Sequence, residues 1–383
     1  MFPQTYLCYI VTMQLLGNNR VFVTGGAGNI GHKLVPFWKN KRVFITGGAG
    51  FIGHHLLSAL IDRGAVTTVG DNLKTGSLEN VFRVWKQHKL KYEKTPYGYE
   101  VEHGHRFILV DFLDKVGTHK AFKNQQVVFH LAATIGGRGF IDTHPADCCE
   151  NFAINQNVFD ACRINAVERV QYASTACVYP FDLQKEYGST YLLKEEDAFK
   201  DGWANSDRQY GWAKLMGELT LAAYHKQYGL KGSVTRYVTA YGPWENDTHA
   251  IIALTRRAVE RKEPYLVWGS GRQDRDFTYV ADIVEGTIAA CEKITDAGSV
   301  NLGTGVRCTM TEVIETIFSI LGWRPKEVVF DKKKPEGVKT RALDISHAKK
   351  LLDWQPQFNL RQGLEKTITW FVNERPKSVE TLR

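Results

Sequence analysis

Two side chains that can move a proton stand four residues apart, at Tyr210 and Lys214. On a helix this spacing puts both of them on one face. The ordinary pKa of a phenol is about 10, so tyrosine is a poor base at neutral pH unless a neighbouring ammonium group favours the phenolate. The same pattern is common on solvated helix faces. Its chemistry therefore depends on what the rest of the chain brings beside it.

Thr175 and Cys177 follow a β-favouring stretch, residues 170–174, at the point where a strand is expected to end. A threonine hydroxyl at a strand end can form a hydrogen bond with a reacting oxygen. A cysteine is by default a small buried apolar residue, but beside a reacting carbon its thiol can act as an acid or a base. Both residues are candidates for catalysis.

His249 precedes a helical pattern that runs through Arg256 and Arg257. Imidazole titrates near neutrality and is suited to carry a proton. The simpler interpretation is a surface or capping residue. Because His249 follows the loop at residues 241–243, we expect it to face the same cleft as Tyr210.

Arg275 and Arg341 are candidate ligands for a diphosphate. A planar guanidinium group matches two phosphate oxygens at once. Surface ion pairs with Asp276 and Asp344 explain the two arginines equally well. Both interpretations stay open on the sequence alone.

A glycine-rich turn at residues 47–53 is the element that would place a cofactor beside these groups. Residues 43–46 favour a strand, Gly47, Gly50 and Gly53 follow, and an apolar helical pattern comes next. A strand that turns directly into a helix presents backbone N–H groups and the positive end of the helix dipole to a pyrophosphate. A glycine pattern alone also occurs in ordinary turns, so its context decides.

Asp71 supplies that context, because it ends the next predicted strand, 24 residues after Gly47. A carboxylate there accepts hydrogen bonds from a ribose diol and repels a 2′-phosphate. The sequence therefore predicts NAD rather than NADP as the cofactor. The residues expected to contact NAD are Gly47, Gly50, Phe51, Ile52, Gly53, Asp71, Asn72, Asp111, Leu131, Ala132, Ala133, Tyr210 and Lys214.

Strands alternate with helical patterns through the first two-thirds of the chain. This alternation predicts an α/β fold, a Rossmann-type doubly wound parallel sheet with a smaller C-terminal α/β lobe for the substrate. Residues 81–105 form a polar excursion. We expect the cofactor domain to span residues 41–241, with a return at about 274–295, and the substrate lobe to comprise residues 242–273 and 296–375.

Residues 18–35 repeat the sequence of residues 40–57. The second copy is the one expected to work, because a full helix, a stop at Gly64 and a strand ending in Asp71 follow it. After the first copy, Pro36 breaks the helix early. We therefore interpret residues 1–40 as a leader with a vestigial duplicated motif. The alternative is that the two copies compete for one position in the sheet.

The composition limits the class of protein. The chain has 383 residues and a net charge of +8, with Lys and Arg spread along its length and without a nucleic-acid motif, so the charge favours a small anionic substrate. Seven cysteines without metal-ligand spacing predict reduced thiols, no metal site and a cytoplasmic location. The apolar patch at residues 6–16 is too short to span a membrane.

These residues together resemble the extended short-chain dehydrogenase/reductase superfamily, in its nucleotide-sugar epimerase and dehydratase branch. The resemblance extends from residue 41 to about 372, through Asn-Leu-Gly-Thr-Gly at 301–305 and Asp-Ile-Ser at 344–346. Residues 135–141 are similar to a substrate loop of GDP-mannose 3,5-epimerases. Residues 174–180 look like a strand-end motif of those enzymes and of GDP-fucose synthases, and residues 248–251 resemble the segment of the synthases that supplies a histidine.

The resemblance implies an NAD-dependent nucleotide-sugar epimerase that inverts carbons 3 and 5 of a GDP-mannose-type substrate through a transient 4-keto sugar. It also implies a homodimer formed through two helices. The expected catalytic residues are Thr175, Cys177, Tyr210, Lys214 and His249. The expected substrate residues are Gly137, Arg138, Asn151, Arg275 and Arg341.

Three departures from these groups leave alternatives open. The loop after residue 243 lacks the lysine of GDP-mannose 3,5-epimerases, Asp71 argues against the NADPH of GDP-fucose synthases, and Ala176-Cys177 replaces the Asp-Glu pair of dehydratases. The alternatives are an NDP-sugar 4-epimerase, a 4,6-dehydratase or reductase, and a nucleotide-sensing protein without catalysis.

Overall fold

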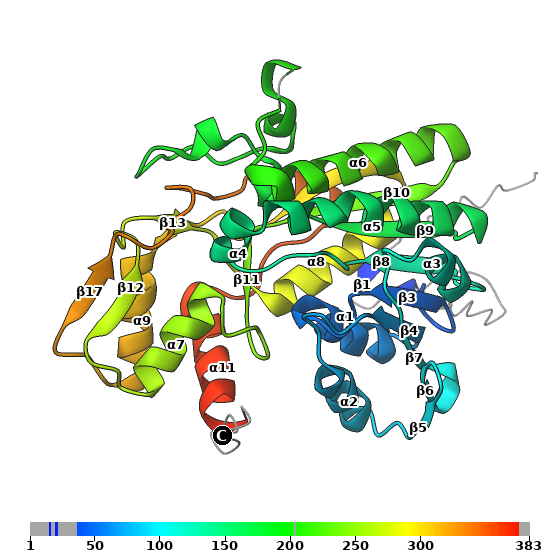
Figure 1. The fold of residues 1–383 in the computed structure, drawn as a ribbon, viewed down its shortest axis with the longest axis horizontal. Coiled ribbons are helices and arrows are strands. Elements are labelled where there is room, and N and C mark those ends of the chain that lie inside the picture. Colours follow the sequence, from blue (N-terminus) through cyan, green and yellow to red (C-terminus); the bar gives the residue numbers. More distant parts are fainter. Residues whose placement is uncertain (1–14, 17–19, 22–36, 203, 375–383) are drawn as a thin grey trace, which may run out of the picture.

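The computed structural model describes residues 37–202 and 204–374, together with the pairs Leu15–Leu16 (β1) and Arg20–Val21 (β2), which pair antiparallel (Figure 1). Apart from those two pairs, the predicted leader up to residue 36 and its duplicated motif at 18–35 lie outside the described residues.

A nine-stranded sheet forms the centre of the molecule. Its order is β15-β10-β9-β8-β3-β4-β7-β6-β5. The seven strands from β15 to β7 are parallel, and β6 and β5 add an antiparallel hairpin at one edge. The strands are β3 (Arg42–Thr46), β4 (Val66–Asp71), β5 (Tyr92–Thr95), β6 (Gly98–Val101), β7 (Arg106–Leu109), β8 (Val127–His130), β9 (Arg169–Thr175), β10 (Lys231–Tyr237) and β15 (Asp296–Leu302).

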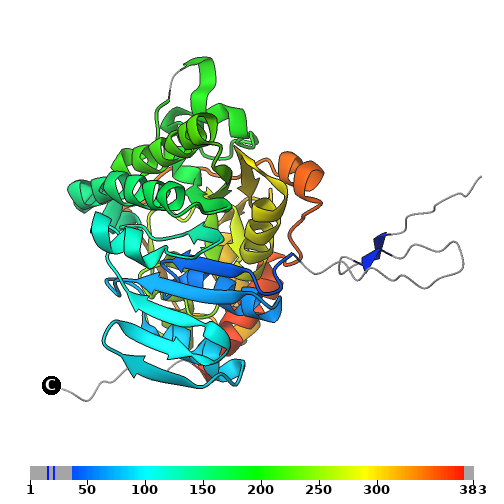
Figure 2. The same ribbon diagram turned by 90° about the vertical axis from the view of Figure 1, so that its right-hand side faces the viewer.

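Helices cover both faces of this sheet, because alternate residues of each strand point to opposite sides. On β3, Val43 and Ile45 pack with α1 (Phe51–Asp62), α2 (Leu78–Gln87) and α8 (Val280–Lys293). Phe44 packs on the other side with α5 (Pro145–Ile164) and α6 (Arg208–Tyr228), where α3 (Lys115–Ala121) also lies. The helices α5 and α6 lie side by side in both views (Figures 1 and 2). The predicted α/β class with a doubly wound parallel sheet is confirmed.

A smaller lobe lies beyond one end of the sheet (Figure 1). Its β12 (Tyr265–Trp268) pairs parallel with β17 (Val328–Asp331), and α7 (Ala250–Val259), α9 (Met310–Leu321) and α11 (Leu360–Asn373) pack nearby. Two short pairs join the lobe to the sheet domain: β11 (Thr239–Tyr241) with β14 (Phe277–Tyr279), and β13 (Asp274–Arg275) with β16 (Cys308–Thr309). The remaining elements are α4 (Arg138–Thr143), α10 (Ser346–Leu352) and the 3-10 turns Glu102–Gly104, Ala176–Val178, Phe181–Gln184 and Glu195–Gly202.

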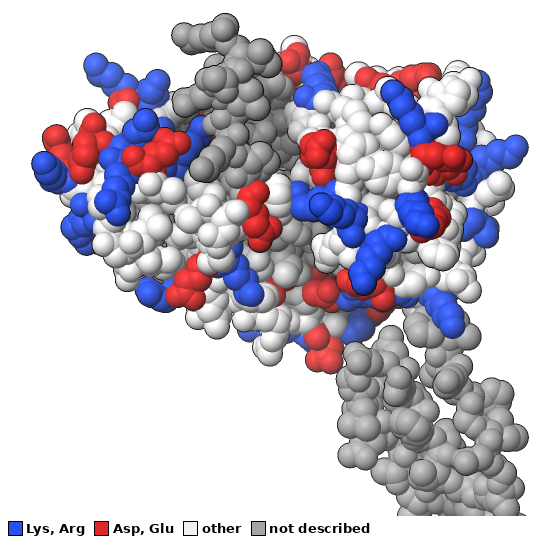
Figure 3. Space-filling view, turned by 90° about the horizontal axis from the view of Figure 1, so that it is seen from below, with Lys and Arg blue, Asp and Glu red and all other residues white. Residues whose placement is uncertain are grey.

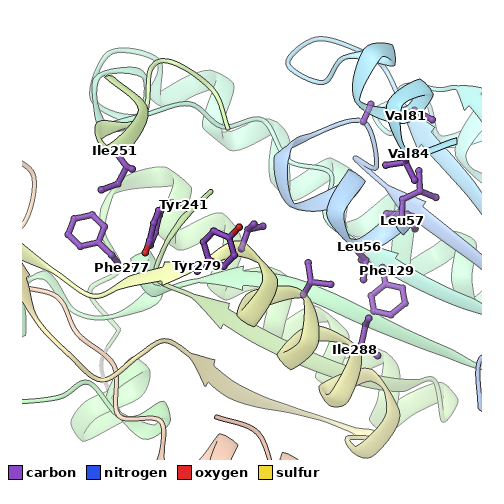
Figure 4. Packing of buried hydrophobic residues seen from close by; sticks show 14 of the residues in the cluster. Leu56, Leu57, Val81, Val84, Phe129, Tyr241, Ile251, Phe277, Tyr279 and Ile288 are labelled. Carbon is purple, nitrogen blue, oxygen red and sulfur yellow. The ribbon is translucent and has the colours of Figure 1, made fainter. Parts of the chain in front are cut away.

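The lobe and the sheet share one hydrophobic core. Figure 4 shows this core running from Leu57 of α1 past Phe129 and Ile288 to Tyr279 and Ile251. Because these side chains form one continuous cluster, the lobe is fixed against the edge of the sheet where the strands β8 and β3 end.

Two expectations about the boundaries need correction. Residues 296–302, assigned to the substrate lobe, form β15, the seventh parallel strand of the main sheet. Only the last three residues of β15 are buried, so its polar start hides the strand in the sequence. The polar excursion at 81–105 contains the end of α2 and the β5–β6 hairpin. In β5, three of four side chains are exposed, which removes the alternation that marks a strand.

Charge and hydropathy agree with this architecture. In the described part of the chain, each helix is too short or too polar to cross a membrane. On the face seen in Figure 3, Lys and Arg side chains are interspersed with Asp and Glu.

Replacing Leu57 by Ala should lower the free energy of unfolding by about 2–5 kcal/mol, since Leu57 is fully buried between α1 and the sheet. Leu109→Ala is the matched control, because Leu109 is 59% exposed on β7, and it should change the value by less than about 0.5 kcal/mol. Urea unfolding measures both. Equal losses for the two variants would contradict the described core.

Candidate active site

The loops that follow β3 and β8 meet at the edge of the sheet where the strand order reverses direction, the usual place for a ligand in such sheets. Gly47 has a φ of 67°, and a Cβ on it would lie 2.8 Å from the backbone N of Ala132. Thr46 Oγ1 accepts hydrogen bonds from Leu131 N (3.1 Å) and Ala132 N (3.0 Å). These contacts hold the glycine turn against the residues that follow β8.

The glycine turn forms a cradle that side chains would fill. A Cβ on Gly53 would lie 2.3 Å from the carbonyl O of Gly47. Gly50 precedes the first residue of α1, where no side chain caps the helix. The free N–H groups and the helix dipole of α1 therefore fit a pyrophosphate. Phe51, Ile52 and Ala133 are half-buried at the rim of this turn.

Asp71 ends β4 and reaches back to the glycine turn. Its carboxylate is buried and accepts hydrogen bonds from Ala49 N (3.0 Å) and Leu73 N (2.8 Å). Burial raises its pKa, and the two backbone N–H groups oppose that shift. Asn72 and Asp111 are exposed at the ends of neighbouring strands, with Asn72 Nδ2 3.3 Å from Asp111 Oδ2. The predicted cofactor residues thus lie together along one edge of the sheet.

Tyr210 and Lys214 lie in the first two turns of α6, and both are buried. Lys214 Nζ donates to the carbonyl O of Ala173 on β9 (2.9 Å) and lies 6.0 Å from the centre of the Tyr210 ring. The predicted placement of the pair on one face of a helix is what the structure has.

The prediction that Lys214 favours the Tyr210 phenolate includes the help of an oxidised nicotinamide, so it stays a prediction for the cofactor-bound enzyme. Burial raises the pKa of the Tyr210 phenol well above its usual value. Burial also lowers the pKa of the Lys214 ammonium to about 7. Near neutral pH the lysine is therefore charged only in part, so its attraction cannot offset the desolvation of the phenolate.

Thr175 and Cys177 stand at the end of β9, against the start of α6. Thr175 Oγ1 accepts the N–H of Cys177 (3.2 Å), which leaves the hydroxyl hydrogen free to donate. Cys177 packs against Tyr210 in a small apolar cluster that includes Ile135 and Phe140 of the 135–141 loop. The strand end, the helix start and this loop therefore meet at one place.

The buried carboxylate of Asp207 connects these segments with Arg138 and Arg341. Its two oxygens accept from Arg138 Nη1 (3.0 and 2.9 Å), and Oδ2 also accepts from Arg341 Nη2 (3.0 Å). Its backbone N–H donates to the carbonyl O of Cys177 (2.8 Å). Burial raises the pKa of Asp207, but the guanidinium groups of Arg341 and Arg138 outweigh it and hold the pKa below its usual value.

Arg341 also reaches Cys177, with Nη1 3.3 Å from Sγ. Arg275 donates to the carbonyl oxygens of Asp274 (2.6 Å) and Glu336 (3.0 Å). A Cβ on Gly337 would lie 3.4 Å from both the Arg138 and the Arg275 side chains. Burial, with Arg341 and Arg138 close by, lowers the pKa of Arg275 to about 10. The guanidinium groups of Arg138, Arg275 and Arg341 thus lie near one another, and that of Arg341 contacts Cys177.

The alternative of surface ion pairs for these arginines is excluded. Asp276 is buried and accepts hydrogen bonds from Thr304 and Gly305 instead. Asp344 Oδ1 accepts the N–H of Ser346. Arg341 pairs with Asp207, which is 134 residues away in the sequence.

His249 is the residue before α7, and its Nδ1 lies 2.8 Å from Glu245 Oε1. A Cβ on Gly137 would lie 3.6 Å from Cδ2 of His249 and 3.2 Å from the carbonyl O of Thr248. The predicted histidine therefore borders the predicted substrate loop, immediately before Arg138.

Asn151 does not take the predicted place at the substrate. It is fully buried on α5, its Oδ1 accepts from Thr134 N, and its Nδ2 donates to the carbonyl oxygens of Thr134 and Cys148, each at 2.9 Å. With its donors and acceptor bonded to the backbone, Asn151 fixes the segment after β8.

Asp207, Glu245 and Gln184 are residues of this site that the sequence pattern does not predict. Gln184 accepts a hydrogen bond from Arg341 Nε (2.5 Å). Asp207 had a local signal, since an aspartate directly before a helical pattern is a favoured N-cap. Its pairing with two arginines, 69 and 134 residues away, has no local signal in the sequence. Across the described residues, no group of three or more His, Cys, Asp or Glu side chains is arranged to hold a metal ion.

Comparisons with known proteins agree with this geometry. The sequence model of the NAD dependent epimerase/dehydratase family matches residues 43–303. GDP-mannose 3,5-epimerase 1 of Oryza sativa subsp. indica is 34% identical over 279 residues, 71% of each chain. UDP-N-acetyl-alpha-D-glucosaminuronate decarboxylase of Bacillus cytotoxicus is 31% identical over 366 residues, 92% of this chain and 97% of the relative. The crystal structure of UDP-glucuronic acid 4-epimerase from Bacillus cereus, in complex with UDP-glucuronic acid and NAD, has a TM-score of 0.72 at 28% identity and covers 86% of this chain and 99% of its own.

Gly53→Ala should weaken NAD binding at least about tenfold, roughly 1.4 kcal/mol, because the new methyl group would lie 2.3 Å from Gly47 O and open the turn. Gly139→Ala is the control, since a Cβ there meets no described atom within 4 Å. Isothermal titration with NAD compares the two. Unchanged affinity of Gly53→Ala would show that the turn does not hold the cofactor.

Lys214 should make the stability of the fold depend on pH. Its pKa of about 7 lies below the unfolded value of 10.5, so between these values the unfolded chain binds more protons. The free energy of unfolding should rise with pH across that window, by at most about 1.4 kcal/mol per pH unit from this group. Lys214→Met should remove this contribution in urea unfolding at pH 7 and pH 9. An identical pH dependence in the variant would contradict the depressed pKa.

Proposed function

The chain belongs to the NAD dependent epimerase/dehydratase family, and on that premise we propose that it inverts carbons 3 and 5 of a GDP-mannose-type nucleotide sugar through a transient ketone at carbon 4. The observation that carries this proposal is the position of Cys177 and His249. Cys177 packs on Tyr210, and His249 borders the neighbouring 135–141 loop. Reversible oxidation at carbon 4 needs Tyr210, Lys214 and Thr175, whereas proton exchange at adjacent carbons needs further acids and bases.

The cofactor of this NAD-dependent enzyme fits the cradle formed by Gly47, Gly50 and Gly53, with Asp71 as acceptor for a ribose. When bound, NAD supplies a hydride acceptor at sugar carbon 4 and a positive charge that favours the Tyr210 phenolate. Lys214, held by the carbonyl O of Ala173, adds its partial charge beneath the same ring.

The side chains of this chain have separate tasks in the proposed reaction. Tyr210 takes the proton from the hydroxyl at carbon 4, and Thr175 donates a hydrogen bond to the same oxygen. The ketone acidifies the hydrogens at carbons 3 and 5. We expect Cys177 and His249 to approach the ring from opposite sides and to remove and return protons there.

Arg138, Arg275 and Arg341 are suited to hold the diphosphate, because their guanidinium groups lie near one another and that of Arg341 contacts Cys177. Asp207 already binds Arg138 and Arg341, so it sets the direction of both side chains and limits their net charge. The 34% sequence identity to GDP-mannose 3,5-epimerase 1 of Oryza sativa subsp. indica supports a GDP-mannose-type substrate.

We further propose a homodimer formed through α5 and α6. Six large apolar side chains are exposed on these adjacent helices, each between 41% and 51%: Phe152, Ile164, Trp212, Met216, Leu219 and Tyr228. Trp212, Met216 and Leu219 follow helical spacing and form one stripe.

The second candidate function is simple 4-epimerisation, favoured by the likeness in structure to the 4-epimerase described above. It uses the same Tyr210, Lys214 and Thr175 but leaves Cys177 and His249 without a task. Proton exchange with solvent distinguishes the two reactions.

Incubation with GDP-mannose in heavy water should place deuterium at carbon 3 or carbon 5 of the sugar. Cys177→Ala should reduce this exchange at least about a hundredfold, while the transient change in nicotinamide absorbance remains. Cys149→Ala is the control, since Cys149 is also a half-buried free thiol. Absence of deuterium at both carbons across a panel of nucleotide sugars would favour 4-epimerisation, and full exchange in Cys177→Ala would show that Cys177 only fills the core.

A further inference from the structure

Glu245 and His249 form a hydrogen-bonded pair in the loop between β11 and α7. Glu245 Oε1 lies 2.8 Å from His249 Nδ1. The two side chains differ in burial: 3% of the Glu245 side chain is exposed, against 39% of the His249 side chain. The carboxylate therefore lies inside the protein, and the imidazole extends from it toward the surface. This arrangement differs from an ordinary solvated ion pair.

The loop that carries this pair is held in place. Trp244 has a φ of 68° and packs between the guanidinium group of Arg83, 3.4 Å from its ring centre, and the ring of Trp370 at 5.1 Å. The N–H of His249 donates to the carbonyl O of Asn246 (3.1 Å). Because both ends of the turn are anchored, the Glu245 carboxylate has a fixed position.

The second oxygen of the carboxylate, Glu245 Oε2, is buried without a hydrogen-bond partner among the described residues, and the backbone of Gly242 lies close enough to the carboxylate to favour its charged form. A buried carboxylate with a free oxygen is costly unless a positive charge compensates it. Cations of the surrounding segments have other partners: Arg256 pairs with Asp247 at 3.4 Å, Arg138 pairs with Asp142 and Asp207, and Arg83 stacks on Trp244. His249 is thus the group that compensates Glu245.

The titration of the pair points the same way. Burial lowers the pKa of His249, but the hydrogen bond and the charge of Glu245 outweigh it, so the pKa rises above 6.5. Burial raises the pKa of Glu245, while His249 and the backbone of Gly242 oppose that rise and favour the carboxylate. With Nδ1 bonded to Glu245, the free N–H of the imidazolium is on Nε2. Its neighbour Cδ2 faces Gly137, where the absence of a side chain leaves room beside the ring.

We propose that Glu245 is a positioning residue: it directs Nε2 of His249 toward the substrate loop and keeps the imidazole protonated, so that His249 is the proton donor. This inference rests on the proposed function. In the step, the enolate electron pair forms the new C–H bond, the Nε2–H bond breaks, and neutral His249 regains a proton from solvent. Cys177 is left as the group that removes the proton on the other side.

Glu245→Gln tests the proposal, with Glu260→Gln as the matched control, because Glu260 is exposed at the end of α7. Both variants are labelled with ¹⁵N-histidine, loaded with NAD and compared by NMR. The signals of His249 are those that are lost in His249→Asn. At pH 7 we expect imidazolium shifts for His249 in the wild type and in Glu260→Gln, and neutral shifts in Glu245→Gln. Deuterium exchange should have a kcat about ten- to hundredfold lower in Glu245→Gln, with KM unchanged.

An unchanged His249 spectrum in Glu245→Gln would overturn the proposal. If that variant fails to fold, the wild-type spectrum decides, because a neutral His249 with its proton on Nε2 also contradicts the proposal and an imidazolium supports it. The spectra need no sugar. The enzyme could therefore show imidazolium signals that depend on Glu245 and yet exchange no sugar hydrogens. That result would contradict the proposed function and leave the pairing of Glu245 with His249 intact.

Discussion

The buried carboxylate of Asp207 is the interaction on which the substrate side of the site depends. It binds Arg138 from α4 and Arg341 from near the C-terminal end of the chain, while its own N–H holds the carbonyl of Cys177. Breaking a buried ion pair of this kind costs about 3–5 kcal/mol, since an unpaired charge is left behind. Segments from three distant parts of the sequence are therefore held as one unit at the start of α6, where Tyr210 follows within one turn.

The cofactor side depends on a different constraint, the close approach of two backbone segments. Gly47 lies against Ala132 without room for a side chain, and Thr46 bonds the same segment. This contact brings the loops after β3 and β8 together at the point where the strand order reverses. Lys214 links the two sides, because it extends from α6 to the carbonyl of Ala173 on β9. The sheet and α6 thus position the glycine turn, Thr175, Tyr210 and Lys214 relative to one another.

Much of this arrangement follows from sequence pattern, and the rest depends on long-range contacts. The glycine turn, Asp71, and the Tyr210–Lys214 spacing are local signals, and each predicts its own position correctly. The side-chain partners of Arg341 are 134, 157 and 164 residues away, so its sequence neighbourhood suggests Asp344 instead. Burial raises the pKa of Tyr210, and the polar, partly exposed start of β15 hides that strand, because neither the depth of a helix nor the edge of a sheet is visible in residue spacing.

The central claim is that Cys177 and His249 face carbons 3 and 5 of a sugar whose carbon 4 lies at Tyr210. A crystal structure of the enzyme with NAD and GDP-mannose tests it most directly. The account predicts the sugar ring between Cys177 Sγ and His249 Nε2, with the diphosphate on Arg138, Arg275 and Arg341. A ring bound with carbon 4 at Tyr210 but with both the thiol and the imidazole out of reach of carbons 3 and 5 would contradict it.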